Sequence, residues 1–196
     1  MTSCLMLVQT ITTLYTAHPG RGLPDRWTLT RIRHVEPPSF SVTPAHTVRV
    51  EANAQAGFAR YRLRTPLKPA KGSLTWKWRT GTPLRGASLH SRPRDDSPVR
   101  VFLVFDDGRM ISYTWGNREP VGDTFVSGST QMSGVIVLRR AEDANDSWCL
   151  ESRDPFEDYR RAFNHAPHPI VAVGIGADTD QLHDHTVAEV GEMVWE

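Results

Sequence analysis

The 196-residue sequence has little cysteine and no long apolar segment, and each absence excludes a class of protein. Cys4 and Cys149 are the only cysteines, and one widely spaced pair forms neither a disulfide framework nor a zinc motif. The apolar stretch at residues 1–17 is interrupted by threonines and is too short and too polar to span a membrane. We therefore expect no transmembrane helix, and Cys149 as a small buried apolar group.

The motifs of several enzyme classes are also missing. The sequence contains no Gly-rich phosphate loop, no serine nucleophile elbow and no paired CxxC. Two histidine pairs, His165 with His168 and His183 with His185, have spacings that occur in metal sites, but Pro167 interrupts the first pair. We expect all four to be solvated loop histidines, with no transition-metal site.

Long helical stretches rich in Leu, Ala, Glu and Lys are absent, whereas 14 Gly and 14 Pro indicate numerous turns. This balance favours an all-β protein. Residues 21–196 fit one β-rich domain, since such domains often reach about 200 residues. Residues 1–20 are interpreted as an N-terminal tail, a mis-assigned start or a degenerate export signal. The favoured interpretation is export.

The net charge is only +1, but it is unevenly distributed along the chain. Residues 1–100 hold 16 Lys and Arg against 5 Asp and Glu, or +11, and residues 101–196 hold 7 against 17, or −10. In a β-sandwich the early and late strands interleave, so that the two halves can pair their charges. Because the basic residues are spaced along strands and not clustered in a tail, we expect no nucleic-acid partner.

Strand patterns recur along the whole chain. Period-two alternation or β-branched and aromatic composition predicts strands at 26–33, 47–52, 58–64, 73–80, 99–105, 110–115, 124–127, 135–139, 147–153, 169–177 and 186–195. Arg60, Arg62 and Arg64 share one face of their strand, which we interpret as a solvated outer face in preference to an anion-binding stripe. Trp76 and Trp78 share a face that is interpreted as buried core in preference to a stacking platform.

A single helix is predicted at residues 155–163. Asp154 is expected to be the N-cap, Pro155 takes the first helical position, and Glu157 would complete a capping box. Asn164 is expected to end the helix in the left-handed conformation.

Asp107-Gly108 lies between two strand-forming segments and is a strong two-residue turn signal, which predicts a β-hairpin with this dipeptide at its tip. If this dipeptide is a two-residue turn, Arg100 pairs with Trp115, and Tyr113 lies on the same face of the hairpin. That face is the predicted ligand site, because it combines aromatic rings with a guanidinium group.

Six blocks in order along the chain, LPDRW, SLTWKWRT, DDSPVRVFLVF, SYTWGN, ESRDPFEDYRRAF and IVAVGIGADTD, together resemble a bacterial family known as domain of unknown function 3047. The resemblance covers residues 23–195, and Asn164 departs from the glycine expected after the helix. It implies an exported β-sandwich of jelly-roll type, similar in layout to carbohydrate-binding and polysaccharide-processing domains. It implies no particular activity.

Polar and aromatic residues of these blocks make up the predicted ligand-binding set. They are Asp96, Arg100, Tyr113, Trp115, Arg153, Asp158, Arg160, Asp178 and Asp180. In the structural interpretation, the arginines and carboxylates form a buried ion network that clamps the helix onto the sheet. In the functional interpretation, exposed Trp115 and Tyr113 stack on a sugar while charged groups bind its hydroxyls.

We therefore expect a jelly-roll-like antiparallel β-sandwich with one short helix, acting as a non-catalytic module that binds a glycan or a similar polar small molecule. One alternative is a carbohydrate-active hydrolase or lyase with two catalytic carboxylates among Asp96, Asp158, Asp178 and Asp180. The other is a purely structural envelope protein. No cofactor is expected; Ca²⁺ at Asp178 and Asp180 is the one alternative, and the segment after them lacks the rest of a calcium loop. The sequence leaves the oligomeric state open.

Overall fold

The computed structural model describes residues 12–128 and 131–196. The interpretation of residues 1–20 as a tail or export signal falls largely outside the described residues. Within those ranges, no helix has the length and apolar character needed to cross a membrane.

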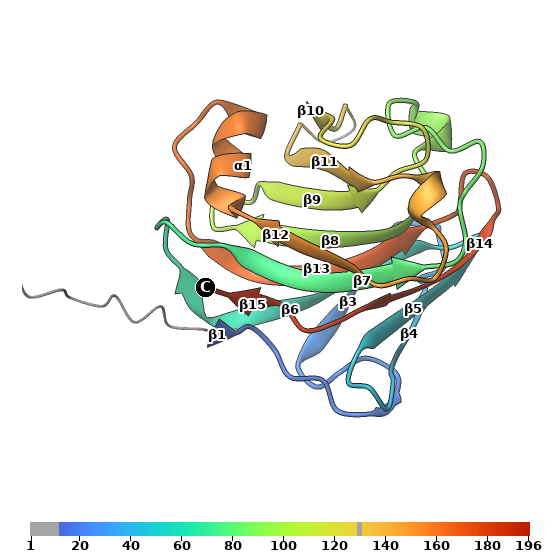
Figure 1. Ribbon diagram of the computed structural model, residues 1–196, viewed down its shortest axis with the longest axis horizontal. Coiled ribbons are helices and arrows are strands. Elements are labelled where there is room, and N and C mark those ends of the chain that lie inside the picture. Colours follow the sequence, from blue (N-terminus) through green and yellow to red (C-terminus); the bar gives the residue numbers. More distant parts are fainter. Residues whose placement is uncertain (1–11, 129–130) are drawn as a thin grey trace, which may run out of the picture.

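The described strands form two sheets (Figure 1). The first, here the β7 sheet, has the order β1 (Thr12–Thr13), β15 (Val194–Trp195), β7 (Leu74–Thr80), β14 (His185–Val190), β5 (Val48–Asn53), β4 (Ser39–Val42) and β2 (Gly20–Arg21), with β12 (Cys149–Arg153) also paired to β7. The second, the β8 sheet, has the order β10 (Thr124–Val126), β11 (Ser133–Arg139), β9 (Met110–Trp115), β8 (Ser97–Phe105), β13 (Ile170–Asp178), β6 (Ala56–Leu67) and β3 (Trp27–Arg31).

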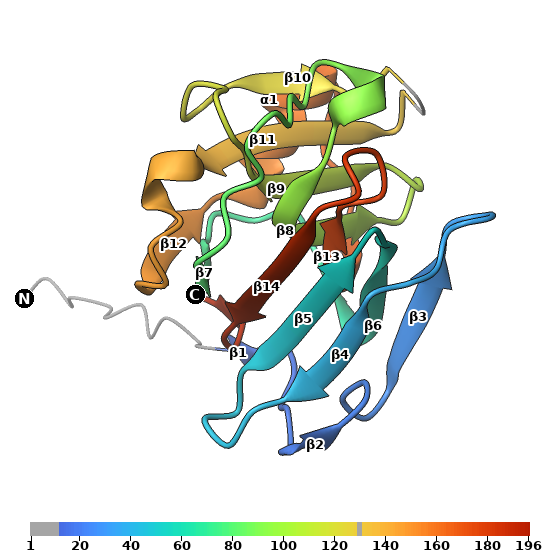
Figure 2. The ribbon, with the colours of Figure 1, turned by 90° about the vertical axis from the view of Figure 1, so that its right-hand side faces the viewer.

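The two sheets pack face to face, as Figure 2 shows for β14, β5 and β4 beside β13, β6 and β3. The predicted β-sandwich is therefore confirmed. Neighbouring strands come from distant parts of the chain, as β13 between β6 and β8 illustrates. One pairing departs from the antiparallel expectation, because β11 runs parallel to β9. The long connection between these strands includes β10, which makes a parallel pairing possible.

The hairpin of β8 and β9 is present, but its predicted register was wrong by one residue. Its turn has three residues, and the backbone N–H of Phe105 donates to the carbonyl of Arg109 at 2.9 Å. Gly108 has a φ of 85°, the left-handed position of a type I turn followed by a bulge. As a result Arg100 pairs with Thr114, and Val101 pairs with Tyr113.

This register directs the large aromatic side chains of β9 into the core. Tyr113 stacks on Trp76 with ring centroids 5.0 Å apart, and Trp115 meets Trp78 edge-on at 5.4 Å. All four side chains are buried, which confirms the core interpretation of Trp76 and Trp78. Aromatic packing of this kind contributes about 0.5–1.5 kcal/mol per pair beyond the buried area.

Helix α1 (Pro155–Phe163) lies at one end of the sandwich, beside β9 and β11 (Figure 1). The Asp154 side chain accepts hydrogen bonds from the backbone N–H groups of Phe156 and Glu157, and Asn164 ends the helix with a φ of 54°. Both predicted ends are therefore confirmed. The Glu157 carboxylate forms an ion pair with Arg160 on the helix surface.

The long connection between β7 and β8 covers part of the outer face of the β8 sheet. Leu84, Ala87 and Leu89 from this loop are buried. The Asn117 side chain donates to the Ala87 carbonyl at 2.9 Å, and Glu119 accepts from the Leu89 backbone N–H at 2.7 Å. A short 3₁₀ turn, η1 (Arg92–Arg94), precedes β8, and another, η2 (Ala141–Asp143), follows β11. The uncovered remainder of this face contains the groove described below.

Strand β13 carries two glycines where aromatic rings need room. A Cβ atom at Gly176 would lie 2.7 Å from the Phe58 Cβ and 3.0 Å from Phe102 Cε2, and also 2.6 Å from the Gly57 carbonyl oxygen. A Cβ atom at Gly174 would lie 2.8 Å from the Ala59 carbonyl oxygen. The apolar, glycine-containing strand therefore lets the two phenylalanine rings lie close to the sheet.

We expect Gly176→Ala to lower the free energy of unfolding by about 1–3 kcal/mol, because the new methyl group overlaps backbone and ring atoms. Gly20→Ala is the matched control, since a Cβ there meets no atom within 4 Å. The measurement is chemical denaturation of both variants. Equal midpoints for the two variants would show that β13 can shift to accept the methyl group.

Candidate ligand-binding groove

The predicted Arg100–Trp115 face does not exist in the structure. Strand β8 points Val101 and Leu103 into the core and Arg100 outward, while β9 points Tyr113 and Trp115 into the core. Arg100 and Trp115 therefore lie on opposite sides of the β8 sheet. The expectation of exposed aromatic rings at Tyr113 and Trp115 was wrong, because both side chains have 0% exposure.

Three of the predicted site residues form a network inside the sandwich. Asp158, which is 2% exposed, accepts from the Tyr113 hydroxyl at 2.8 Å and forms an ion pair with Arg153. This network joins α1 to β9 and β12, as the structural interpretation predicted. Arg160 does not belong to it, because its guanidinium pairs with Glu157 on the exposed surface of the helix.

The remaining four predicted residues do come together. Asp178 is the last residue of β13, and Asp180 follows it. Asp96 directly precedes β8, the antiparallel neighbour of β13, and Arg100 lies near the start of β8. Arg100 lies 3.7 Å from an Asp178 oxygen. One carboxylate oxygen of each aspartate lies within 4.8 Å of the others. Arg100, Asp178 and Asp180 line one end of a groove of about 350 Å³ on the outer face of the β8 sheet, whereas Asp96 is buried and does not line it.

The sequence interpretation missed the aromatic floor of this groove. Phe58 on β6 and Phe102 on β8 line it, with ring centroids 5.0 Å apart. Phe102 is outside the main core cluster although it is only 8% exposed. The signal was present in the sequence: each ring falls on the face of its strand that otherwise carries arginine.

Several buried polar atoms at the charged end of the groove have no hydrogen-bond partner among residues 12–128 and 131–196. They are Asp178 Oδ1, Asp180 Oδ1, Gln181 Oε1 and Arg100 Nε. By contrast, the oxygens of Asp96 accept from the backbone N–H groups of Gln181 and Leu182, at 3.2 and 2.9 Å. Asp96 therefore fastens the loop after β13 to β8, while the unpartnered atoms remain available for a ligand.

Burial and neighbouring charge change the protonation of this cluster. Burial raises the pKa of Asp178 to about 8; the Arg100 guanidinium opposes the shift, and a hydrogen bond from Asp180 adds to it. Burial also raises the pKa of Asp95 and of Asp96. At neutral pH the Asp178 carboxyl group therefore retains its proton, which gives the groove a donor in addition to its acceptors.

The three carboxylates of the cluster are spaced closely enough for one Ca²⁺ ion, whose oxygen ligands lie about 2.3–2.6 Å from the metal. Arg100 already supplies positive charge to Asp178, however, and Asp178 retains its proton at neutral pH. A cation would have to displace both the guanidinium group and the proton.

Other polar residues that were singled out lie on the surface. His165, His168, His183 and His185 are exposed, and so are Arg60, Arg62 and Arg64. His168 pairs with Asp106 and His185 with Glu51. No three histidine, cysteine, aspartate or glutamate side chains among residues 12–128 and 131–196 cluster for metal binding except the groove aspartates.

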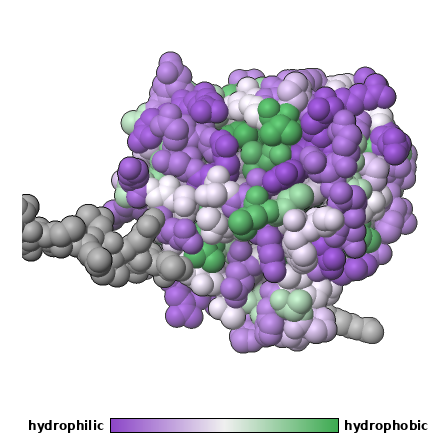
Figure 3. Space-filling view, viewed as in Figure 1, coloured by the Kyte–Doolittle hydropathy of each residue, from purple (hydrophilic) through white to green (hydrophobic). Residues whose placement is uncertain are grey.

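The outer face of the β7 sheet contains another aromatic residue that could stack on a ligand, Trp148, which is 39% exposed. Figure 3 views the side on which β12 and β7 lie and shows hydrophobic surface within a mainly hydrophilic face; Leu150 on β12 is 74% exposed. Lys77 and Arg79 each lie 4.8 Å from the centre of the Trp148 ring. Because Lys77 and Arg79 already lie over the Trp148 ring, this ring is less available to stack on a ligand than the rings of Phe58 and Phe102.

A comparison with models of known protein families identifies the family of this chain. The model of the family described as "Protein of unknown function (DUF3047)" matches residues 25–194. The chain belongs to this family. The resemblance inferred from the six sequence blocks is thereby confirmed. No curated protein matches the chain.

Solved structures with similar folds have low sequence identity to this chain. The xyloglucanase domain of NopAA from Sinorhizobium fredii, solved with cellobiose, is 12% identical with a TM-score of 0.52; the match covers 93% of this chain and 99% of that one. The family 11 carbohydrate-binding module of Lic26A-Cel5E from Clostridium thermocellum is 7% identical with a TM-score of 0.48, over 96% and 95% of the chains. A family 29 carbohydrate-binding module variant is 9% identical with a TM-score of 0.47, over 95% and 91%. At these identities the likeness extends to the fold only.

Trp115→Ala is expected to destabilise the protein by about 3–5 kcal/mol, because it removes a fully buried indole and leaves a cavity beside Trp78. Thermal and chemical denaturation would measure the loss. A variant with wild-type stability would contradict the burial of Trp115.

Asp178→Asn is expected to change how stability depends on pH. The folded pKa of about 8 is above the ordinary value of 3.8, so between these pH values the folded state retains a proton that the unfolded state has released. Stability therefore falls across this window as pH rises. Asparagine carries no such proton, and the fall should become smaller by at least about 1.4 kcal/mol, the value of one unit of pKa shift. Urea denaturation at pH 5 and pH 8.5 would test this, and parallel profiles would contradict it.

Proposed function

We propose that this β-sandwich module binds a neutral carbohydrate in the groove on the outer face of the β8 sheet, without catalysing a reaction. The observation that carries the proposal is the set of buried, unpartnered polar atoms next to an aromatic floor. Phe58 and Phe102 provide an apolar surface for the C–H face of a sugar ring. Arg100 Nε provides a donor, and the Asp178 and Asp180 oxygens provide acceptors for sugar hydroxyls.

The charge of the groove favours a neutral sugar over an acidic one. Asp95, Asp178 and Asp180 line its end together with Arg92 and Arg100, and Arg100 pairs with Asp178. Because these opposite charges balance one another, the groove offers a uronate carboxylate no excess of positive charge, whereas a sugar hydroxyl can donate to the carboxylate oxygens or accept from the Asp178 proton. The neighbouring folds with carbohydrate-related names are consistent with this ligand class, but the residues of the groove carry the argument.

The spacing of the carboxyl groups disfavours the hydrolase alternative. In glycosidases the two catalytic carboxyl groups are about 5–5.5 Å apart in retaining enzymes and about 6.5–9.5 Å apart in inverting enzymes. One carboxylate oxygen from each of Asp96, Asp178 and Asp180 lies within 4.8 Å of the others, and Asp178 and Asp180 share a hydrogen bond, which leaves no room for a sugar or a water between these two carboxyl groups. Asp158, the fourth eligible carboxylate, is engaged with Arg153 and Tyr113 in the core. We therefore propose binding and not turnover.

We expect Phe102→Ala and Phe58→Ala each to weaken glycan binding by about tenfold, the equivalent of about 1.4 kcal/mol. The measurement is affinity electrophoresis of the full chain with soluble xyloglucan, other neutral β-glucans and, for comparison, polygalacturonate, followed by calorimetry on the best binder. Trp148→Ala is the matched control, since it removes an exposed aromatic ring from the other sheet. Circular dichroism and melting curves confirm that each variant is folded.

The outcomes of this screen are distinct. Retention of wild-type affinity in both phenylalanine variants would place the site elsewhere, and loss in Trp148→Ala would move it to the β7 sheet. Preference for polygalacturonate would contradict the charge argument. Adding Ca²⁺ or a chelator should leave binding unchanged, because Arg100 pairs with Asp178 and the Asp178 carboxyl group retains its proton at neutral pH. Product release from any of the polysaccharides would contradict a purely binding role.

A further inference from the structure

A second pocket, of about 650 Å³, lies away from the groove, between the N-terminal segment and the end of β6. One wall is residues 12–16, and the opposite wall is Tyr61 together with residues 63–67. A volume of this size lies within the range of about 300–1,000 Å³ typical of small-molecule sites. None of the residues that line it lines the groove.

The floor of this pocket is apolar and held in place by packing. Leu14, Tyr15, Tyr61 and Leu63 line it and are each less than 10% exposed. Trp27 packs behind the two tyrosines, with ring centroids 4.9 Å from Tyr15 and 6.0 Å from Tyr61. The Tyr15 hydroxyl donates to the Gly191 carbonyl at 2.7 Å, which ties this wall to the β7 sheet. A floor braced in this way can accept an apolar ligand without rearrangement.

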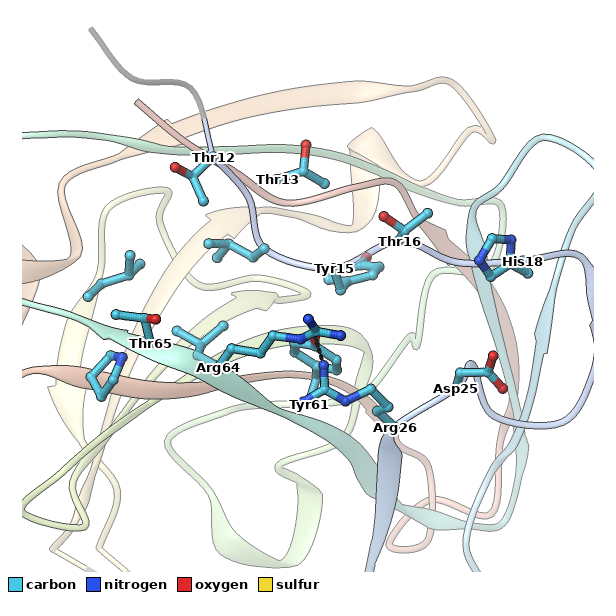
Figure 4. A pocket seen from close by; sticks show the side chains of 14 residues that line it. Thr12, Thr13, Tyr15, Thr16, His18, Asp25, Arg26, Tyr61, Arg64 and Thr65 are labelled. Atoms are coloured by element: carbon cyan, nitrogen blue, oxygen red, sulfur yellow. Dashed lines mark hydrogen bonds between the residues drawn. The ribbon is translucent and has the colours of Figure 1, made fainter.

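Two guanidinium groups lie above the floor. Arg26 donates to the Tyr61 hydroxyl at 3.1 Å, and its guanidinium carbon lies 5.3 Å from the centre of that ring. Figure 4 shows the side chains of Arg26 and Arg64 directed toward Tyr61 in the middle of the pocket, with His18 and Asp25 at one end. In the part of the chain that the structure describes, neither arginine forms an ion pair with a carboxylate.

The backbone of Arg26 is also unusual. Its φ is 66°, in the left-handed region that non-glycine residues seldom occupy. The adjacent turn, in which the Trp27 N–H donates to the Pro24 carbonyl at 3.1 Å, holds Arg26 at the pocket. A strained conformation at a residue whose charge faces a cavity is typical of ligand-binding positions.

We propose that this pocket binds an amphiphilic carboxylate, with the carboxylate between Arg26 and Arg64 and the apolar body on the floor of Leu14, Tyr61 and Leu63. Guanidinium groups match the planar carboxylate with paired N–H donors, and two of them without an acidic partner make an anion the complementary ligand. The hydrocarbon part replaces water over apolar side chains, which favours binding in proportion to the area covered. A neutral glycan in the groove and a carboxylate here would bind independently.

Decanoate is a suitable probe, with decanol as its uncharged counterpart. We expect the full chain to bind decanoate in isothermal titration calorimetry at concentrations below micelle formation, and to bind decanol at least tenfold more weakly. Arg64→Ala should weaken decanoate binding at least tenfold. Arg26→Lys should also weaken it, because lysine keeps the positive charge but lacks the paired N–H donors of the guanidinium group. Arg62→Ala is the matched control, because Arg62 is an exposed arginine of the same strand and does not line the pocket.

Each result bears directly on the inference. Absence of decanoate binding to the wild-type chain would overturn it, and so would equal affinities for decanoate and decanol. Wild-type affinity in Arg64→Ala, or equal loss in Arg62→Ala, would also overturn it. Phe102→Ala should leave decanoate binding unchanged, so that failure of this inference and failure of the proposed glycan site are distinguishable.

Discussion

The three-residue turn at residues 106–108 is the constraint on which most of the molecule depends. It sets the register between β8 and β9, and a one-residue change would exchange the two faces of β9 relative to β8. With the observed register, the rings of Tyr113 and Trp115 enter the core, where Tyr113 stacks on Trp76 and Trp115 meets Trp78 edge-on. The same register leaves Arg100 and Phe102 on the outer face, where they become part of the groove.

The two clusters of arginine and aspartate in this protein have similar composition but different surroundings. Asp158 receives hydrogen bonds from Tyr113 and Arg153, so its charge is fully compensated inside the sandwich. Asp178 lies at a strand end beside another carboxyl group and retains a buried oxygen without a partner. In the first arrangement, removal of one partner would leave an uncompensated buried charge, which is strongly destabilising. The second leaves polar atoms that a ligand can satisfy.

Much of the local structure followed from the sequence. The strands with alternating side chains, the helix from Pro155 to Phe163 and its ending at Asn164 are all observed. These features depend on interactions between residues a few positions apart, such as the N-cap hydrogen bonds of Asp154. The strand β4 was missed, because its four residues carry a pattern too short to separate from a loop. The parallel pairing of β9 and β11 was missed as well, since nothing local specifies which distant strand becomes a neighbour.

By itself, the sequence determined the all-β class and the family, and it marked Asp96, Arg100, Asp178 and Asp180 as candidates without placing them together. Their gathering follows from the pairing of β8 with β13, two strands that are far apart in the sequence. Only the tertiary structure decided that Tyr113 and Trp115 are core residues and that Phe58 and Phe102 form the floor of a groove. The physical reason is that burial depends on which face of a strand meets the opposite sheet. That choice changes with a single residue in a turn, and the glycines of β13 then determine where the rings of neighbouring strands can lie.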